Sequence, residues 1–360
     1  MGLSPQRKGK ASRTGSAADT SVDLARLLDI VGAVSRQTIC VVGDLVLDEF
    51  VSTEISRVSR EAPVLILRHR ETAAFPGGGA NAASNLAALG ARVMVVGAVG
   101  DDANGKALVD SLKARGIDVS RVVRVAGAAT TTKTRFLAGW QHTTEQQVLR
   151  IDREPAPELP AAVSGALIKK ARAASKRADA VLISDYGFGA ATPELAGALK
   201  PKIVTLDSRF RLLSYADAGV TAATPNEAEI EAAYGEKIGP DQAKLDTLGR
   251  RAMNELRLDS LVVTRGKDGM AVFTGGGKAT AATATRHIPI FGSDAPVDVT
   301  GAGDTVIAAF TLALAAGASP IEAAQLATYA AGIAVMKRRT ATVTRAELEA
   351  ALRREATAQK

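Results

Sequence analysis

Short hydrophobic runs rich in β-branched residues alternate along the chain with longer segments rich in alanine and leucine. Such runs are typical of strands buried on both faces, and the longer segments are typical of the helices that cover them. The pattern therefore predicts an α/β fold with a mostly parallel sheet between two layers of helices. The predicted strands are 39–44, 93–99, 180–186, 203–207, 220–224 and 261–265.

Two segments, residues 51–72 and 121–151, depart from this pattern. They are rich in Val, Ile, Thr and Arg, they alternate in places, and they lack helical periodicity. They predict β-strands set apart from the main sheet, which would suit a lid over a binding site, and an ordinary edge hairpin is the alternative. Because no internal repeat or proline-rich linker divides the chain, residues 21–360 are predicted to form one domain carrying this insertion.

The chain has 360 residues, of which 46% are hydrophobic, and a formal net charge of +7. Its first 20 residues are basic, small and polar without an apolar core, which predicts a disordered tail rather than a signal peptide. Much of the positive charge lies near the termini and at 337–339, so a solvated surface is favoured over nucleic-acid binding. No apolar run approaches the roughly 20 residues of a membrane span.

The single cysteine, Cys40, lies in an apolar run, which excludes an internal disulfide and suits a reducing compartment. We therefore expect a buried hydrophobic side chain at Cys40 and a cytoplasmic protein.

Residues 298–310 combine a glycine turn with the start of a helix of small residues. Gly301, Ala302 and Gly303 can turn amide hydrogens toward one point at the helix N-terminus, where negative charge is stabilised. Asp304 follows in the first turn, and the helix dipole should favour its charged form, so it is predicted to accept a proton at neutral pH. This combination suits transfer of a phosphoryl group to a hydroxyl, with magnesium neutralising the phosphates.

Four further clusters of candidate residues follow predicted strands or open predicted helices. Asp44 ends the first strand, where a carboxylate could accept hydrogen bonds from sugar hydroxyls, and this position favours it over Asp48. A turn or cap is the alternative for both. Gly77–Gly79 precede Asn81 and would let a ligand approach the main chain, although a structural turn fits equally well.

Asn226 and Glu229 share one face at the start of a predicted helix. They could hold water on a magnesium ion, but a capping box requires the same spacing and is the favoured interpretation from the spacing alone. Thr264 then ends a predicted strand that leaves through Gly266 and Gly269, as a nucleotide-binding turn or an ordinary hairpin would.

Taken together, the segments 76–90, 226–229 and 298–305 resemble the ribokinase-like sugar kinases, also called the phosphofructokinase B family. The resemblance extends from about Ile39 to Leu352 and implies a three-layer α/β/α sandwich with a small β-lid, an ATP substrate and a magnesium cofactor. Within that family, the chain is most similar to the kinases of D-glycero-β-D-manno-heptose 7-phosphate, which implies phosphorylation of the anomeric hydroxyl in ADP-heptose synthesis. This further similarity rests on segments 41–50, 56–64, 76–91, 184–190 and 298–309.

The resemblance also implies roles for individual residues. Asp304 would be the catalytic base and Gly301 to Gly303 the anion hole. The sugar would contact Asp44, Gly78, Gly79, Asn81 and Asp185, with Arg57 of the lid and Arg209 near its phosphate. The nucleotide and its magnesium would contact Asn226, Glu229 (through water), Thr264, Gly266 and Gly269. Asp298 and Thr300 would lie near a monovalent-cation site, which makes potassium a candidate activator, and lid strands that pair between subunits would give a homodimer.

Two positions depart from the pattern of the relatives. Ser208 and Arg209 follow Asp207, where the heptose kinases usually have proline and lysine, and arginine does not replace lysine freely at a fitted site. Arg339 stands where relatives usually have glycine, close to the expected purine pocket. Both departures concern the substrate more than kinase chemistry. A kinase for another sugar or a nucleoside, and a non-catalytic ligand-binding protein on the same scaffold, are therefore the alternatives.

Overall fold

The computed structural model describes residues 23–139, 145–155, 158–275 and 284–358, so the predicted N-terminal tail lies outside the described residues. An eight-stranded sheet forms the centre, in the order β14-β13-β12-β11-β10-β9-β1-β4. Its strands are β1 (Thr38–Gly43), β4 (Arg92–Val96), β9 (Ala180–Asp185), β10 (Val204–Ser208), β11 (Ala222–Ala223), β12 (Ser260–Thr264), β13 (Met270–Thr274) and β14 (Ala284–Ile288). All six predicted strands are present and parallel, and two antiparallel strands, β13 and the edge strand β14, are additional.

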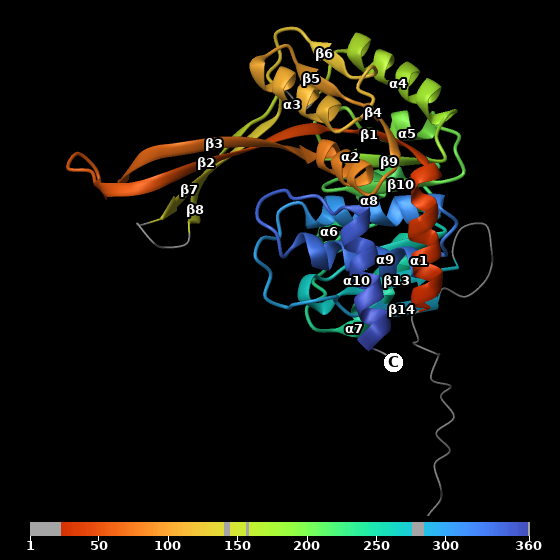
Figure 1. Cartoon of the computed structure of the whole chain (residues 1–360). Coiled ribbons are helices and arrows are strands. Elements are labelled where there is room, and N and C mark those ends of the chain that lie inside the picture. The colour runs from red at the N-terminus through yellow and green to blue at the C-terminus, as the bar shows by residue number, and fades with distance from the viewer. Residues whose placement is uncertain (1–22, 140–144, 156–157, 276–283, 359–360) are drawn as a thin grey trace, which may run out of the picture.

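Side chains of the central strands alternate between two hydrophobic cores. In β1, Ile39 and Val41 belong to one core, whereas Cys40 and Val42 belong to the other. Because successive side chains point to opposite faces, both faces of this strand need a covering layer. Helices supply it on each side, so the predicted three-layer α/β/α fold is confirmed (Figure 1).

The first core receives α1 (Leu24–Ala33), α2 (Gly79–Ala88), α3 (Ala103–Ala114), α8 (Ala302–Ala315), α9 (Pro320–Ala334) and α10 (Arg345–Ala358). The second core receives α4 (Ala161–Ser175), α5 (Pro193–Gly197), α6 (Glu227–Tyr234) and α7 (Gln242–Glu255). None of the helices in the described ranges is long and apolar enough to cross a membrane. Cys40 is fully buried as predicted, and burial raises the pKa of its thiol to about 12.

A second sheet of four strands has the order β3-β2-β7-β8. Its strands are β2 (Leu45–Val58), β3 (Leu65–Gly78), β7 (Thr132–Gly139) and β8 (Gln146–Arg153), and a small parallel pair joins β5 (Ala98–Gly100) to β6 (Val123–Val125). In Figure 1, β2 and β3 run as a long ribbon away from the body of the molecule. Exposed hydrophobic side chains occur along this sheet, at Leu149 and Ile151 of β8, at Val58 at the end of β2 and at Val64 just before β3.

Candidate active site

The turn before α8 requires glycine at position 301. Gly301 has φ +79°, and a β-carbon built there would lie 2.5 Å from Nδ2 of Asn81 in helix α2. Both the left-handed backbone and the close approach of α2 therefore exclude larger residues. This turn starts helix α8 directly against helix α2 and fixes the position of Asp304 in the first helical turn.

Asp304 is buried, with only 4% of its surface exposed. Asn81 Nδ2 donates to one of its carboxylate oxygens at 2.8 Å, and the Tyr186 hydroxyl donates to the other at 2.9 Å. The prediction that its charged form is favoured is wrong for the protein without ligands. Burial and the negative charges of Asp207 and Asp48 raise the pKa of Asp304 to about 8, against the two hydrogen bonds, which act to lower it.

Fewer backbone N–H groups are available for the predicted anion hole than the three expected from Gly301, Ala302 and Gly303. The Ala302 N–H donates to the Val299 carbonyl oxygen at 3.2 Å and is therefore occupied in this conformation. The N–H groups of Gly303 and Asp304 belong to the first turn of α8, where the helix itself supplies no acceptor. These two amides and the helix dipole remain suited to an anion.

A cavity of about 240 Å³ adjoins the start of α8. Its walls include Thr264, Gly266, Gly269, Ala302 and Gly303, so residues predicted to contact the nucleotide and the anion meet around one space. The other lining residues include the apolar side chains of Met270, Ile290, Phe291, Val299, Val306 and Val335. An apolar pocket beside a helix N-terminus suits a ligand with a flat apolar ring and an anionic end.

The turn from Gly266 to Gly269 also serves a hairpin, since β12 and β13 pair as antiparallel neighbours. A side chain at Gly269 would collide with the Ile288 carbonyl oxygen. The hairpin interpretation of this turn is therefore confirmed, and because the hairpin forms part of the cavity wall, the nucleotide-binding interpretation stays a prediction.

Asn226 and Glu229 form the capping box of α6. The Asn226 side chain accepts from the Glu229 N–H, and the Glu229 carboxylate accepts from the Asn226 N–H, both at 2.9 Å. Burial raises the pKa of Glu229 to about 7, with Arg209 acting to lower it. Burial also raises the pKa of nearby Asp207 to about 7, and the charge of Glu229 adds to this effect. Glu229, Asp207 and the exposed Arg209 thus lie close enough to interact electrostatically.

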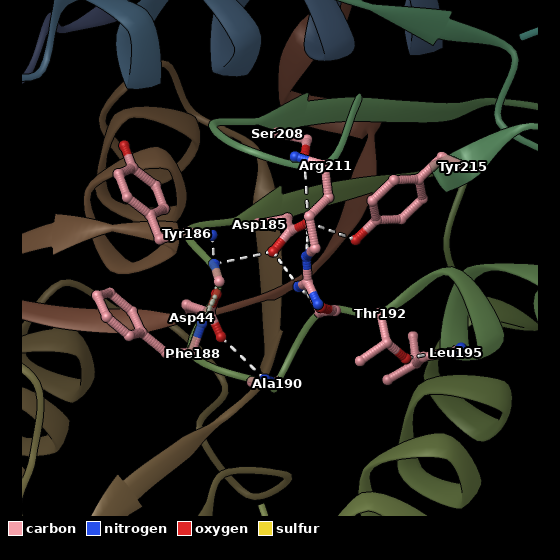
Figure 2. A network of polar contacts seen from close by, with 12 residues as sticks. Asp44, Asp185, Tyr186, Phe188, Ala190, Thr192, Leu195, Ser208, Arg211 and Tyr215 are labelled. Atoms are coloured by element: carbon pink, nitrogen blue, oxygen red, sulfur yellow. Dashed lines mark hydrogen bonds and ion pairs between the residues drawn. The ribbon is translucent and has the colours of Figure 1, made fainter. Parts of the chain in front are cut away.

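Asp44 does not present its carboxylate to a ligand, contrary to the prediction. One oxygen accepts from the N–H groups of Tyr186 and Phe188 at 2.8 and 3.0 Å, and the other accepts from the Ala190 N–H at 2.9 Å (Figure 2). The carboxylate is buried at the end of β1, and these hydrogen bonds hold the loop that follows β9 in place. Asp44 therefore positions Tyr186, whose hydroxyl contacts Asp304.

Asp185 was also predicted to bind substrate, but in the structure its carboxylate accepts hydrogen bonds from other groups of the protein. It is 1% exposed and accepts hydrogen bonds from Ser208, Arg211 and Tyr215 as well as from the Gly187 N–H (Figure 2). These contacts join the ends of β9 and β10 beneath the loop that carries Tyr186. Asp185 is thus a structural centre rather than a ligand contact.

Asp48 was the less favoured of the two candidate carboxylates after the first strand. It is nevertheless the one that interacts with Asp304. It is 5% exposed, pairs with Arg135 of β7 and acts electrostatically on Asp304. A β-carbon on Gly77 would collide with its carboxylate, which explains one glycine of the triple run. Gly78 has φ +54°, and β-carbons at Gly78 and Gly79 would approach the Asp44 carbonyl oxygen within 3.1 and 3.2 Å, so the turn is structural as well.

Sequence reasoning missed Tyr186 and Arg135 as site residues. Tyr186 was contained in the segment 184–190 that carried the family resemblance, but nothing in the sequence indicated that its hydroxyl reaches α8. The contact of Arg135 with Asp48 depends on the parallel pairing of β7 with β2, in which Phe50 is opposite Arg135. Strand pairing across such a sequence separation is not visible in a local pattern.

Arg57 is not brought to this site within the chain. It is exposed near the far end of β2, nine residues beyond Asp48. At about 3.3 Å per residue this corresponds to roughly 30 Å along the strand. The predicted phosphate contact would therefore have to come from a second subunit.

Asp298 and Thr300 lie in the loop that precedes α8. Asp298 accepts hydrogen bonds from the N–H of Thr300 at 2.9 Å and from the N–H of Arg339 at 2.8 Å. Although burial acts to raise the pKa of Asp298, these hydrogen bonds lower it. Its carboxylate is therefore ionised at neutral pH.

Comparison with known proteins identifies the family. Residues 36–347 match the model of the pfkB family carbohydrate kinases. The chain belongs to this family. Its members with similar sequences include the "Bifunctional protein HldE" of Geobacter sulfurreducens, 39% identical over 87% of this chain and 62% of the relative, and that of Geobacter metallireducens, 40% identical over 86% and 61%. The chain thus spans less than two thirds of the length of these relatives.

Solved structures of other proteins have the same fold as this chain. Arabidopsis thaliana ribokinase complexed with ribose and ATP superposes with a TM-score of 0.68 at 21% identity, covering 88% of this chain and 98% of the other. Escherichia coli phosphofructokinase-2 in complex with potassium gives 0.69 at 18% identity, covering 89% and 99%. The family and the ribokinase-like fold predicted from the sequence are therefore confirmed.

Proposed function

We propose that this protein is an ATP-dependent kinase that phosphorylates the anomeric hydroxyl of D-glycero-β-D-manno-heptose 7-phosphate. The observation that carries the proposal is the place of Asp304. Its buried carboxylate stands at the N-terminus of α8, beside a cavity with an apolar wall and the Gly303 amide. A proton acceptor and an anion-binding helix end are thereby held within one helical turn. The heptose substrate rests on the resemblance of segments 41–50, 56–64 and 184–190.

The reaction follows from this arrangement. ATP would lie in the cavity with its γ-phosphate toward the start of α8. The sugar hydroxyl would attack the γ-phosphorus as the bond to the bridging oxygen of ADP breaks, and the hydroxyl proton would pass to Asp304. Asn81 and Tyr186 orient the carboxylate by donating one hydrogen bond to each of its oxygens. Because the pKa of Asp304 is about 8 without ligands, the active fraction of the enzyme should grow as the pH rises toward 8.

Magnesium and potassium are both compatible with the residues present. Glu229 has one oxygen occupied by the Asn226 N–H, and its other oxygen could hold water on magnesium, which commonly keeps several waters beside one or two carboxylates and substrate phosphates. No group of three or more possible metal-ligating side chains occurs in the described part of the chain, so the phosphates would supply the main ligands. Bound magnesium would neutralise phosphate charge during transfer. Asp298 and Thr300 would border the potassium.

The exposed hydrophobic side chains of the lid support a homodimer. Val58, Val64, Leu149 and Ile151 are each more than half exposed. A second lid sheet packed against these side chains would cover them, and it would offer a route for Arg57 to reach the partner's site. We accordingly place the protein in the cytoplasm as a dimer, in keeping with its single buried thiol.

A substrate panel tests the proposal. ADP release is measured with heptose 7-phosphate, fructose phosphates, unphosphorylated sugars and nucleosides, and the site of phosphorylation is determined by ³¹P NMR. We expect the highest kcat/KM with heptose 7-phosphate and a 1,7-bisphosphate product. A preferred unphosphorylated sugar or nucleoside would replace the proposed substrate, and no acceptor-dependent ADP release from any member would favour a non-catalytic role.

A further inference from the structure

Arg339 follows helix α9 and has a left-handed backbone conformation, with φ +64°. This conformation is unfavourable for residues with a β-carbon and natural for glycine, the residue that the family resemblance leads us to expect here. Its N–H donates to the Asp298 carboxylate at 2.8 Å, which holds the backbone in place. The backbone conformation at position 339 is therefore unfavourable for arginine. What arginine adds at this position, compared with glycine, is its side chain.

The side chain of Arg339 crosses to the lid root, which we define as Phe50, Ser52 and Phe75. Its guanidinium carbon is 5.7 Å from the ring centres of both Phe50 and Phe75, and these rings pack edge to face. One guanidinium nitrogen donates to the Ser52 hydroxyl at 3.4 Å. Arg339 is not among the residues that line the 240 Å³ cavity, and its side chain extends to the lid root instead.

The guanidinium of Arg339 has no ion-pair partner within the described ranges of the chain. The carboxylates around it are engaged elsewhere: Asp48 pairs with Arg135, Asp298 accepts from backbone N–H groups, and Glu145 accepts from the Ser52 hydroxyl at 3.3 Å. A guanidinium has five N–H donors, of which one makes a long hydrogen bond here. The remaining donors can bind a phosphate with two parallel hydrogen bonds.

The lid root borders the same site as the proposed base. Phe75 is opposite Asp48 in the pairing of β2 with β3, and Asp48 acts electrostatically on Asp304. Thr340, the residue after Arg339, has its methyl carbon 3.4 Å from the β-carbon position of Gly301. Arg339 thus lies between the lid root near Asp48 and the turn at Gly301 that precedes Asp304.

The charges of the site also give a phosphosugar one preferred orientation. Asp304 and Asp207 would repel a phosphate once they are ionised, whereas Arg339 would attract it. Resting on the proposed kinase function, we propose that Arg339 binds the non-reacting phosphate of the sugar substrate. It thereby selects phosphorylated over unphosphorylated sugars and leaves the opposite end of the sugar toward Asp304.

The test uses Arg339→Gly in the full chain, because this change restores the residue that the backbone favours. The variant should be at least as stable as the wild type. We expect its ratio of kcat/KM for heptose 7-phosphate to kcat/KM for the unphosphorylated heptose to fall about tenfold to a hundredfold, the effect of losing charge-assisted hydrogen bonds. The KM for ATP should stay unchanged, and Arg339→Lys should lose less. Arg338→Ala, at the exposed neighbouring position, is the control and should keep the wild-type ratio.

The outcomes separate this inference from the proposed function. An unchanged ratio in Arg339→Gly, or an equal fall for both sugars, would overturn the phosphate-binding role while leaving the kinase assignment intact. A wild-type protein that phosphorylates no phosphosugar would instead refute the proposed function, and the inference with it.

Discussion

Replacement of Gly301 by alanine should damage both the stability and the activity of the protein. The new β-carbon would lie 2.5 Å from Asn81 Nδ2, an atom that also donates to Asp304. Alanine at φ +79° adds about 1–2 kcal/mol of backbone strain, and overpacking against buried Asn81 adds about 1–3 kcal/mol. We therefore expect the free energy of unfolding to fall by roughly 2–5 kcal/mol.

Activity should fall as well, because Asn81 must move and it orients the base. Displacing a catalytic group by about 1 Å can reduce turnover about a hundredfold. Urea unfolding and steady-state kinase assays measure the two effects. Gly303→Ala is the matched control for stability, since a β-carbon at Gly303 meets no atom within 4 Å and its φ is not positive. If Gly301→Ala were as stable as Gly303→Ala, the close approach of α2 and α8 inferred here would be wrong.

Two further predictions concern the buried carboxylates. The folded pKa values of Asp44, Asp207, Glu229 and Asp304 are raised to about 6, 7, 7 and 8, so the stability from burying these groups uncharged is present at low pH and lost between about pH 4 and pH 8. Urea unfolding should give a lower free energy of unfolding at pH 8 than at pH 5. At pH 8, Asp304→Asn should be more stable than the wild type by at least about 1 kcal/mol. Equal pH dependence of stability in both proteins would contradict the raised pKa of Asp304. Asp185→Asn should reduce the free energy of unfolding by about 2–4 kcal/mol, because the buried carboxylate holds the ends of β9 and β10. A stable variant with only a raised sugar KM would instead restore Asp185 as a substrate contact.

The sequence predicted the layers of the fold well because burial on both faces leaves a local signal. Each parallel strand appears as a hydrophobic run, and the capping box of Asn226 and Glu229 follows from a spacing of three residues. The short edge strand β14 gave no such signal. Its partner β13 was implied only by the hairpin alternative for the turn at Gly266 and Gly269, because β13 follows that turn directly.

The site was predicted less completely, since the roles of its acids depend on partners far away in the sequence. Asp44 and Asp48 are four residues apart, and the strand-end position favoured Asp44, but backbone N–H groups of the loop at 186–190 occupy the Asp44 carboxylate. The pKa of Asp304 could not be predicted from its place at a helix start, because the sequence shows neither its burial nor the neighbouring Asp207, which both raise it. Arg339 appeared only as a departure, and its contacts with the lid root required the folded chain.

The central claim, that Asp304 accepts the proton of a sugar hydroxyl during phosphoryl transfer, is tested most directly by single-turnover measurement on Asp304→Asn. The variant keeps the shape of the side chain and removes its basicity. With saturating ATP, magnesium and heptose 7-phosphate, we expect bisphosphate formation to fall by a factor of about 10²–10⁴, the usual contribution of a general base, while nucleotide affinity stays at the wild-type level. Near-normal phosphoryl transfer by this folded, nucleotide-binding variant would contradict the account.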